Sequence, residues 1–192
     1  MAGPDVRVTP LTSEPLRDLV DIWNAAAGEA FPLREAVFRQ NTVDDPNFDP
    51  AGCAIARAGP DGRVVGFCVA KVARVPIGAD GLTPEDGWIS ILAVHPAAQR
   101  RGAAAALLEA GETFLRGRRC RHILLGGDPG HFFPGVPAGT AAVHFFERAG
   151  YRLRGEAYDL RRSLGGYQTP DAVSAALAAH PDLEIRPLTP QD

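Results

Sequence analysis

At 192 residues the chain suits one domain with some length to spare, and its 45% hydrophobic content is enough for a sizeable core. The formal net charge of -3 gives no bulk electrostatic attraction to nucleic acid or to anionic membranes, so neither is expected as a partner. The absence of a membrane-spanning apolar stretch and of a signal-peptide pattern predicts a cytoplasmic protein.

The cysteines give no sign of a metal centre. Cys53, Cys68 and Cys120 stand at wide, irregular spacing, and no C-x-x-C pair is present. The histidines are not spaced to complete a metal site with them. We therefore expect reduced, buried thiols in strands and no metal.

The first 75 residues carry alternating strand and helix signals. The pattern predicts a short strand at 6–8, an amphipathic helix that starts after Pro15, and a second short helix at 33–40. Strands are expected at 53–57 and 64–75, because the Gly-Pro-Asp-Gly sequence between them is typical of a hairpin turn.

The central stretch, residues 88–108, reads WISILAVHPAAQRRGAAAALL. The apolar, β-branched run from Ile89 to Val94 predicts one buried strand, which His95-Pro96 stops because proline cannot donate to a ladder. From Gly102 to about Arg116 the strong helix formers alanine, leucine and glutamate dominate, so this part is predicted to be a helix.

The turn between this strand and helix has the features of an anion site. It places unpaired backbone N–H groups, the positive end of the helix dipole and two arginines together. Gly102 and the alanines after it leave the backbone uncovered, so a bulky anion can approach closely. The turn therefore predicts a phosphate or pyrophosphate site.

The rest of the chain continues the alternation. Residues 122–125 predict a strand parallel to the central one across a right-handed helical crossover. Residues 126–137, GGDPGHFFPGVP, contain too much Gly and Pro for regular structure. A helix at 139–149 and two strands of a hairpin at 151–154 and 156–161 are expected to follow.

Two motifs of this sequence resemble those of the GNAT family, the acyl-CoA-dependent N-acyltransferases. Val94, Gln99, Gly102 and Ala104 match motif A, V-x-x-x-x-[QR]-x-x-G-x-[GA]. Residues 141–151, AAVHFFERAGY, resemble the motif B helix that ends in F-Y-E-K-x-G-F. The resemblance implies an α/β (α+β) fold: a mixed, mostly antiparallel central sheet that splays between two parallel strands and is flanked by helices.

The resemblance accounts for residues 1–163 as a GNAT acyl-CoA-binding domain. Residues 164–192 are interpreted as a linker helix, at 172–180, and the first strand of a second, truncated GNAT domain, because LEIRPLT at 183–189 resembles VRVTPLT at 6–12. Tandem GNAT proteins have this layout. The alternative is a tail strand that pairs with the sheet edge or with a partner.

The resemblance also implies acetyl-CoA or coenzyme A as the cofactor, bound between the two splayed strands. The pantetheine arm would add like a strand along Leu92, Ala93 and Val94, and an amide there would polarise the thioester carbonyl. The pyrophosphate would lie on the turn, where the binding residues are Gln99, Arg100, Arg101, Gly102, Ala103 and Ala104. Phe146 of motif B is also expected to contact the cofactor.

Three positions depart from the family pattern. Phe146 replaces a tyrosine that protonates the departing thiolate, Ser90 replaces a frequent carboxylate, and Gly139 replaces an asparagine. The candidate catalytic residues are therefore Ser90 itself and the substitutes Asp128, His131 and Tyr158. The loop that holds Asp128 and His131 has a second interpretation, a rigid hydrophobic plug.

The expected function is the transfer of acetyl from acetyl-CoA to a primary amine by direct attack. The alternative is a catalytically degenerate acyl-CoA-binding domain that supports an active second domain. The partners implied are a small-molecule or peptide amine, with a second GNAT domain in cis or a homodimer as further options. Glu29, Phe31 and Arg34 are candidate acceptor contacts, since the helices at that place overhang the acceptor site of the family.

Overall fold

The computed structural model describes residues 6–75, 83–128, 130, 133–158, 160, 162–182 and 186. It divides into a unit of residues 1–155 and a unit of residues 156–192, an earlier division than the one expected at 163. His131 and most of the strand expected at 183–189 lie outside the described residues.

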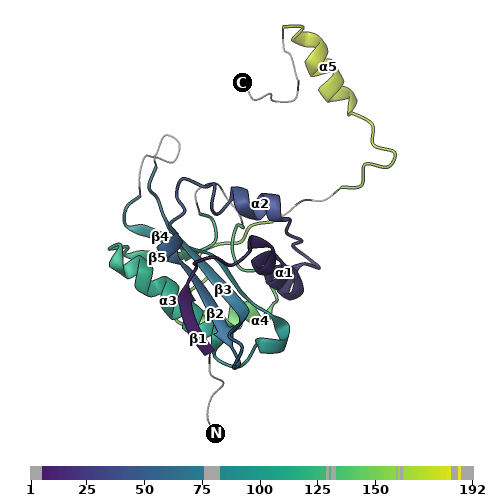
Figure 1. Cartoon of the computed structure of the whole chain (residues 1–192). Helices are drawn as coiled ribbons and strands as arrows, with labels where there is room; N and C mark the ends of the chain where they lie inside the picture. The colour runs from purple at the N-terminus through teal and green to yellow at the C-terminus, as the bar shows by residue number, and fades with distance from the viewer. Residues whose placement is uncertain are drawn as a thin grey trace. The chain divides into compact units, whose positions relative to one another are not determined.

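A five-stranded sheet in the order β1-β2-β3-β4-β5 forms the centre of the first unit (Figure 1). The first four strands pair antiparallel, and β4 pairs parallel with β5. This confirms the expected mixed, mostly antiparallel sheet. The bounds are β1 Val6–Pro10, β2 Cys53–Ala58, β3 Arg63–Val72, β4 Asp86–Val94 and β5 His122–Leu125.

Helices cover both faces of the sheet, as Figure 1 shows for α1 and α3. The helices of this unit are α1 Leu16–Ala27, α2 Glu35–Gln40, α3 Ala103–Gly117 and α4 Ala141–Arg148. Short 3-10 turns occupy Pro50–Gly52 and Pro96–Ala98. The layers are therefore helix, sheet and helix, as an α/β fold requires.

Two buried clusters hold these layers together. Leu19 and Trp23 of α1 pack with Phe67, Val69 and Ile91 on one face of the sheet. On the other face the cluster joins α3, through residues such as Leu107 and Leu115, to Cys68, Ala70 and Ile89. Because successive strand residues point to opposite faces, the continuous apolar run of each central strand supplies both clusters.

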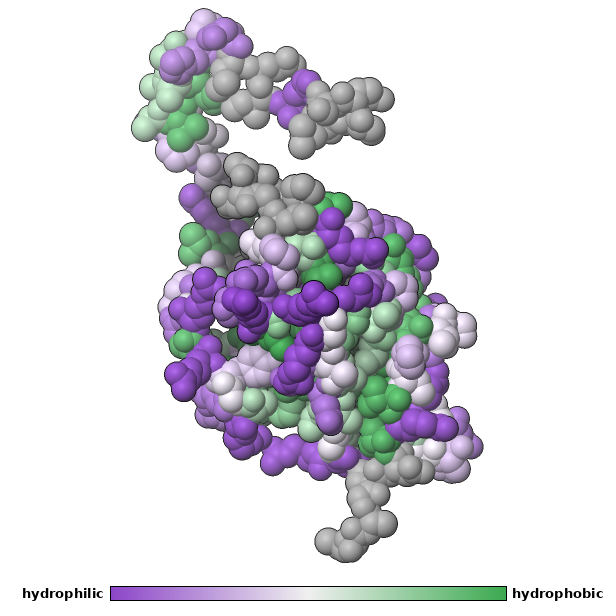
Figure 2. Space-filling view, turned by 90° about the vertical axis from the view of Figure 1, so that its left-hand side faces the viewer, coloured by the Kyte–Doolittle hydropathy of each residue, from purple (hydrophilic) through white to green (hydrophobic). Residues whose placement is uncertain are grey.

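The outer surface of α3 is polar. Glu109, Thr113 and Arg116 are exposed along it, and hydrophilic residues cover much of the face that Figure 2 presents, the side on which α3 lies in Figure 1. The helix therefore has one apolar stripe toward the sheet and one solvated face.

The strands expected at 151–154 and 156–161 are absent from the described residues, so that prediction was wrong. Apolar alternation produces a strand only where the backbone finds a partner and one face is buried. Leu153, Tyr158 and Leu160 are 80%, 78% and 96% exposed, so neither condition holds.

The second unit contains α5, Asp171–Ala179, close to the helix expected at 172–180. None of its residues is buried. Its role as a linker to a further domain stays a prediction.

Candidate cofactor and acceptor site

Strands β4 and β5 separate after a short parallel pairing. The pairing runs from Asp86 and His122 to Ile89 and Leu125. The backbone N–H of Gly126 then donates to the Ile89 carbonyl over 3.0 Å, the last contact of the ladder. Beyond Ile89, β4 continues to Val94 while the chain after β5 becomes a loop, so the sheet opens on this side.

The opening begins at a β-bulge in β4. Ile89 pairs with Ala70 and Ile91 pairs with Val69, which leaves Ser90 as the extra residue. The bulge reverses the facing of the strand, because Ile89 belongs to the cluster under α3 and Ile91 to the cluster under α1. Such bulges are over-represented next to active sites, where they redirect side chains.

The backbone of β4 beyond the bulge directs polar groups into the opening. The His95 amide donates to the Val65 carbonyl of the neighbouring strand β3 over 2.8 Å. Since neighbouring residues of an antiparallel ladder point alternately toward and away from the partner, Ala93 is bonded to β3, whereas Leu92 and Val94 point away from it. Leu92, and Val94 through its amide, therefore present backbone groups where β5 has ended.

The turn between β4 and α3 is braced by side chains. His95 Nδ1 accepts from the Ala97 amide at 3.2 Å, and Gln99 Nε2 donates to the Val94 carbonyl at 2.9 Å. Gln99 thus holds the end of the strand to the turn. Arg100 and Gly102 both have positive φ, 61° and 88°. This conformation is uncommon for a residue other than glycine, and such strain clusters at ligand sites.

The start of α3 is open to an anion. In the described part of the chain, the backbone amides of residues 100–105 donate to no acceptor of the protein. The Arg100 and Arg101 side chains are exposed and form no ion pair with a described residue. A Cβ added at Gly102 would meet no atom within 4 Å. The amides, the helix dipole and two cations can therefore bind a diphosphate together.

Phe146 is part of the packing beside this turn. It is 8% exposed and belongs to the cluster that includes Val94 and Ala103. Its ring meets that of Tyr151 edge to face at 5.6 Å between centroids. The Tyr151 hydroxyl donates to Glu112 Oε1 at 2.8 Å, and burial together with this carboxylate raises the Tyr151 pKa.

The loop after β5 closes back onto α1. The Phe133 ring stacks on Trp23, with centroids 4.5 Å apart, and meets Phe31 edge to face. Asn24 holds the segment after α1 through two 2.8 Å hydrogen bonds with the backbone of Leu33. This part of the loop is therefore a hydrophobic plug, the second interpretation of the sequence, while Glu29 and Arg34 are exposed near it.

Asp128 lies in the same loop but in a charged environment that the sequence did not reveal. Its Oδ2 lies 2.8 Å from Lys71 Nζ, and Lys71 also contacts Asp45 Oδ2 at 2.6 Å. Sequence reasoning missed Lys71 and Asp45. The available signal was a lone lysine within the apolar run of β3.

The other candidate catalytic residues are distributed differently. Ser90 is buried in the bulge, and its Oγ has no partner among the described atoms. Tyr158 lies in the second unit, is 78% exposed and contacts the Glu156 carboxylate. The structure thus brings Ser90 and Asp128 to the opening of the sheet, and the other two stay predictions.

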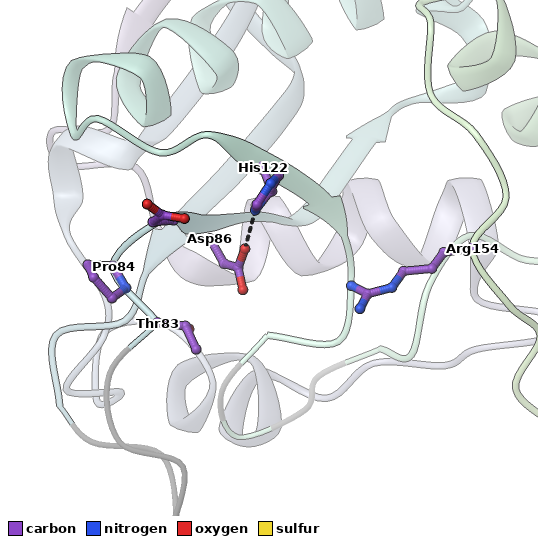
Figure 3. Close-up of a pocket in the computed structure, with 6 residues that line it drawn as sticks. Thr83, Pro84, Asp86, His122 and Arg154 are labelled. Atoms are coloured by element: carbon purple, nitrogen blue, oxygen red, sulfur yellow. Dashed lines mark hydrogen bonds and ion pairs between the residues drawn. The ribbon is translucent and has the colours of Figure 1, made fainter.

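A cavity of about 690 Å³ lies at the opposite ends of β4 and β5. Figure 3 shows His122 paired with Asp86 across the two strands, at 2.9 Å, with Arg154 pointing toward them. This cavity is distinct from the opening, because Asp86 and His122 begin their strands and the opening follows their carboxyl ends.

In the described part of the chain, no helix has the length and apolar character that a membrane crossing requires.

A sheet that opens between two parallel strands, with a bare helix N-terminus at the mouth, defines a class of α/β domains that bind a diphosphate-bearing ligand. The chain belongs to the acetyltransferase (GNAT) family, whose model matches residues 16–151.

The sequence is similar to two mycothiol acetyltransferases. It is 33% identical over 140 residues to that of Cellulomonas flavigena and 38% identical over 107 residues to that of Rhodococcus erythropolis. These alignments cover 68% and 54% of this chain, but only 37% and 31% of the relatives. The chain thus spans about a third of the length of the curated relatives it matches.

Solved structures support the fold. The ribosomal-protein-S18-alanine N-acetyltransferase of Escherichia coli superposes with a TM-score of 0.54 at 21% identity, over 76% of each chain. A glucosamine N-acetyltransferase region of a fungal multi-domain β-N-acetylglucosaminidase gives a TM-score of 0.66 at 22% identity, over 94% of this chain and 21% of that one.

Proposed function

We propose that this domain is an acetyl-CoA-dependent N-acetyltransferase that transfers acetyl to a primary amine by direct attack. The observation that carries the proposal is the set of amides at residues 100–105 that donate to no described acceptor, at the start of α3 and after the part of β4 that extends beyond its pairing with β5. Family membership supports the same reading, since GNAT acetyltransferases use acetyl-CoA. We also propose the cytoplasmic location that the sequence predicts.

The residues present fit such a ligand. The turn would hold the diphosphate through its amides and through Arg100 and Arg101. Leu92 and Val94 would bond a pantetheine-like chain as a strand, with Phe146 packing beside it. Bound acetyl-CoA supplies the acetyl group as a thioester, and a β4 amide directed into the opening would stabilise negative charge on its carbonyl oxygen.

The proposal also names a chemical class for the acceptor. Curated relatives at 33% and 38% identity are named for mycothiol, so a thiol-bearing primary amine is the first acceptor to test. Cysteamine and cysteine are simple members of that class. A second GNAT domain or a homodimer as partner stays a prediction.

The experiment has two steps. Acetyl-CoA should raise the melting temperature by mass action, and no shift at millimolar concentration would refute cofactor binding. Acetyl transfer is then followed by mass spectrometry with cysteamine, cysteine and glucosamine, because thiol acceptors would interfere with detection of free coenzyme A. Binding without transfer to any of these amines would favour the degenerate-domain alternative, for which Phe146 lacks the proton of a tyrosine.

A further inference from the structure

Three charged side chains are buried together on the α1 side of the sheet. Lys71, the only lysine of the chain, lies between Asp45 and Asp128 at 2.6 and 2.8 Å. The side chains of Lys71, Asp45 and Asp128 are 1%, 9% and 0% exposed. One ammonium group therefore faces two carboxylates away from water, and the cluster holds more acidic than basic groups.

One carboxylate oxygen of this cluster has no hydrogen-bond partner among the described atoms. Asp128 Oδ2 is bonded to Lys71, but Oδ1 is buried and has no hydrogen-bond partner among the described atoms. An unsatisfied buried polar group destabilises the folded state. Native structures keep such groups where a water, an ion or a chemical task accounts for them.

The position of Asp128 indicates a chemical task. It follows Gly126, the residue that donates to Ile89 at the last contact between β4 and β5. Ser90, whose Oγ is also buried and unpartnered among the described atoms, is the next residue of β4. Lys71 lies on β3 opposite Trp88, two positions before Ser90. The cluster thus lies beside the end of the β4–β5 pairing, where the opening begins.

An acceptor amine that enters this opening from solution is protonated and must lose a proton before it can attack. An alkyl amine has a pKa of about 10.4, so it is an ammonium ion at neutral pH and cannot attack. A base within hydrogen-bond reach, or one water away, must remove the proton. A buried carboxylate oxygen beside an excess of acidic groups suits both the attraction of the cation and the removal of its proton.

Resting on the proposed function, we propose that Asp128 is the base for a cationic primary amine and that Lys71 is its positioning residue. An N–H bond of the ammonium breaks, the proton passes through one water to Asp128 Oδ1, and the electron pair remains on nitrogen for attack. Lys71 fixes Oδ2 so that Oδ1 stays unpaired, and Asp45 fixes Lys71 from its other side. The charged groups facing Asp128 in the described structure are Lys71 from β3 and, through it, Asp45 from the segment after α2.

The test compares Asp128→Asn with the matched control Asp44→Asn, an exposed aspartate paired only with Arg39 among the described residues. Acetyl transfer to cysteamine is measured from about pH 7 to about pH 9.5, with acetyl-CoA affinity taken from thermal shifts. Asp128→Asn should keep the affinity within about threefold and lower kcat about 100-fold at pH 7. The loss should shrink at high pH, because a neutral amine needs no base.

A second variant tests the positioning role. Lys71→Met with Asp45→Asn removes one charge of each sign and leaves Asp128 unheld, so kcat should fall about tenfold with KM for acetyl-CoA unchanged, and the loss should again shrink at high pH. A folded Asp128→Asn variant with wild-type kcat, or with the same loss at every pH, would overturn the proposal. A wild-type protein that binds acetyl-CoA but acetylates no amine would instead overturn the proposed function, and the base with it.

Discussion

Gly126 and Ile89 form the hydrogen bond at which the two parallel strands of the sheet part, with the Gly126 amide 3.0 Å from the Ile89 carbonyl. Three elements of the candidate site follow this hydrogen bond along the chain. The bulge at Ser90 follows it on β4, Asp128 follows it in the loop, and the anion-binding turn follows at the end of β4. The proposed cofactor turn and the proposed base thus both follow one contact in the sheet.

The diphosphate turn is tested by reversing one charge. Arg101→Glu should weaken acetyl-CoA binding at least tenfold, because it exchanges an attractive for a repulsive charge beside the exposed amides. Arg119→Glu, the same change beyond the other end of α3, should leave binding within about twofold. Isothermal titration calorimetry measures both, and equal affinity for the two variants would contradict the site.

The close packing of α3 on the sheet depends on the absence of a side chain at Gly111. A Cβ there would lie 2.8 Å from Ile89 Cδ1 and 3.0 Å from Cys68 Sγ. Gly111→Ala should therefore lower the free energy of unfolding by about 1–3 kcal/mol. Gly117→Ala is the matched control, since a Cβ there meets nothing within 4 Å, and it should be neutral or stabilising by about 0.5 kcal/mol. Denaturant titration that finds no difference between the two would refute the close packing.

The amino-terminal segment is held by a carboxylate with a shifted pKa. Burial alone would raise the pKa of Glu14, but hydrogen bonds from the Thr12 and Ser13 amides and the charge of Arg57 lower it below 4.5. A lowered pKa contributes stability above the unfolded value, and this contribution is lost as pH falls through the folded value.

Glu14→Gln should therefore lower the free energy of unfolding by about 1–2 kcal/mol at pH 7. The difference from wild type should close as the pH falls below about 4.5. Urea titrations at both pH values measure it. A difference that persists unchanged at low pH would mean that the charge of Glu14 does not carry the stabilisation.

We predict that Tyr151 is a structural phenol rather than a replacement for the missing tyrosine of motif B. Its hydroxyl is bonded to Glu112 of α3, and burial and this carboxylate raise its pKa. Tyr151→Phe should cost about 1 kcal/mol of stability and leave kcat for acetyl transfer within about twofold. Tyr167→Phe, which keeps the ring under Arg162 in the second unit, should change neither quantity. A large drop in kcat for Tyr151→Phe alone would make Tyr151 the proton donor.

The sequence determined what depends on neighbouring residues along the chain. The strand at 122–125, the end of β4 before His95-Pro96 and the helix that follows Gly102 all agree with the structure, because a run of apolar residues, a proline or a glycine acts within a few positions. The geometry of the turn before this helix belongs to this group, since its amides are exposed by the start of a helix that the local sequence dictates. Phosphate binding there stays a prediction.

Only the tertiary structure decided what depends on partners far along the chain. Lys71 meets carboxylates that lie 26 and 57 residues away, and the bulge at Ser90 exists because β3 and β4 fall out of register there. The strands expected at 151–161 failed for the same reason, since apolar alternation alone brings no partner backbone. The turn proposed to bind the cofactor could therefore be predicted from the sequence, whereas the charged cluster of Lys71, Asp45 and Asp128 arises only when the sheet brings distant segments together.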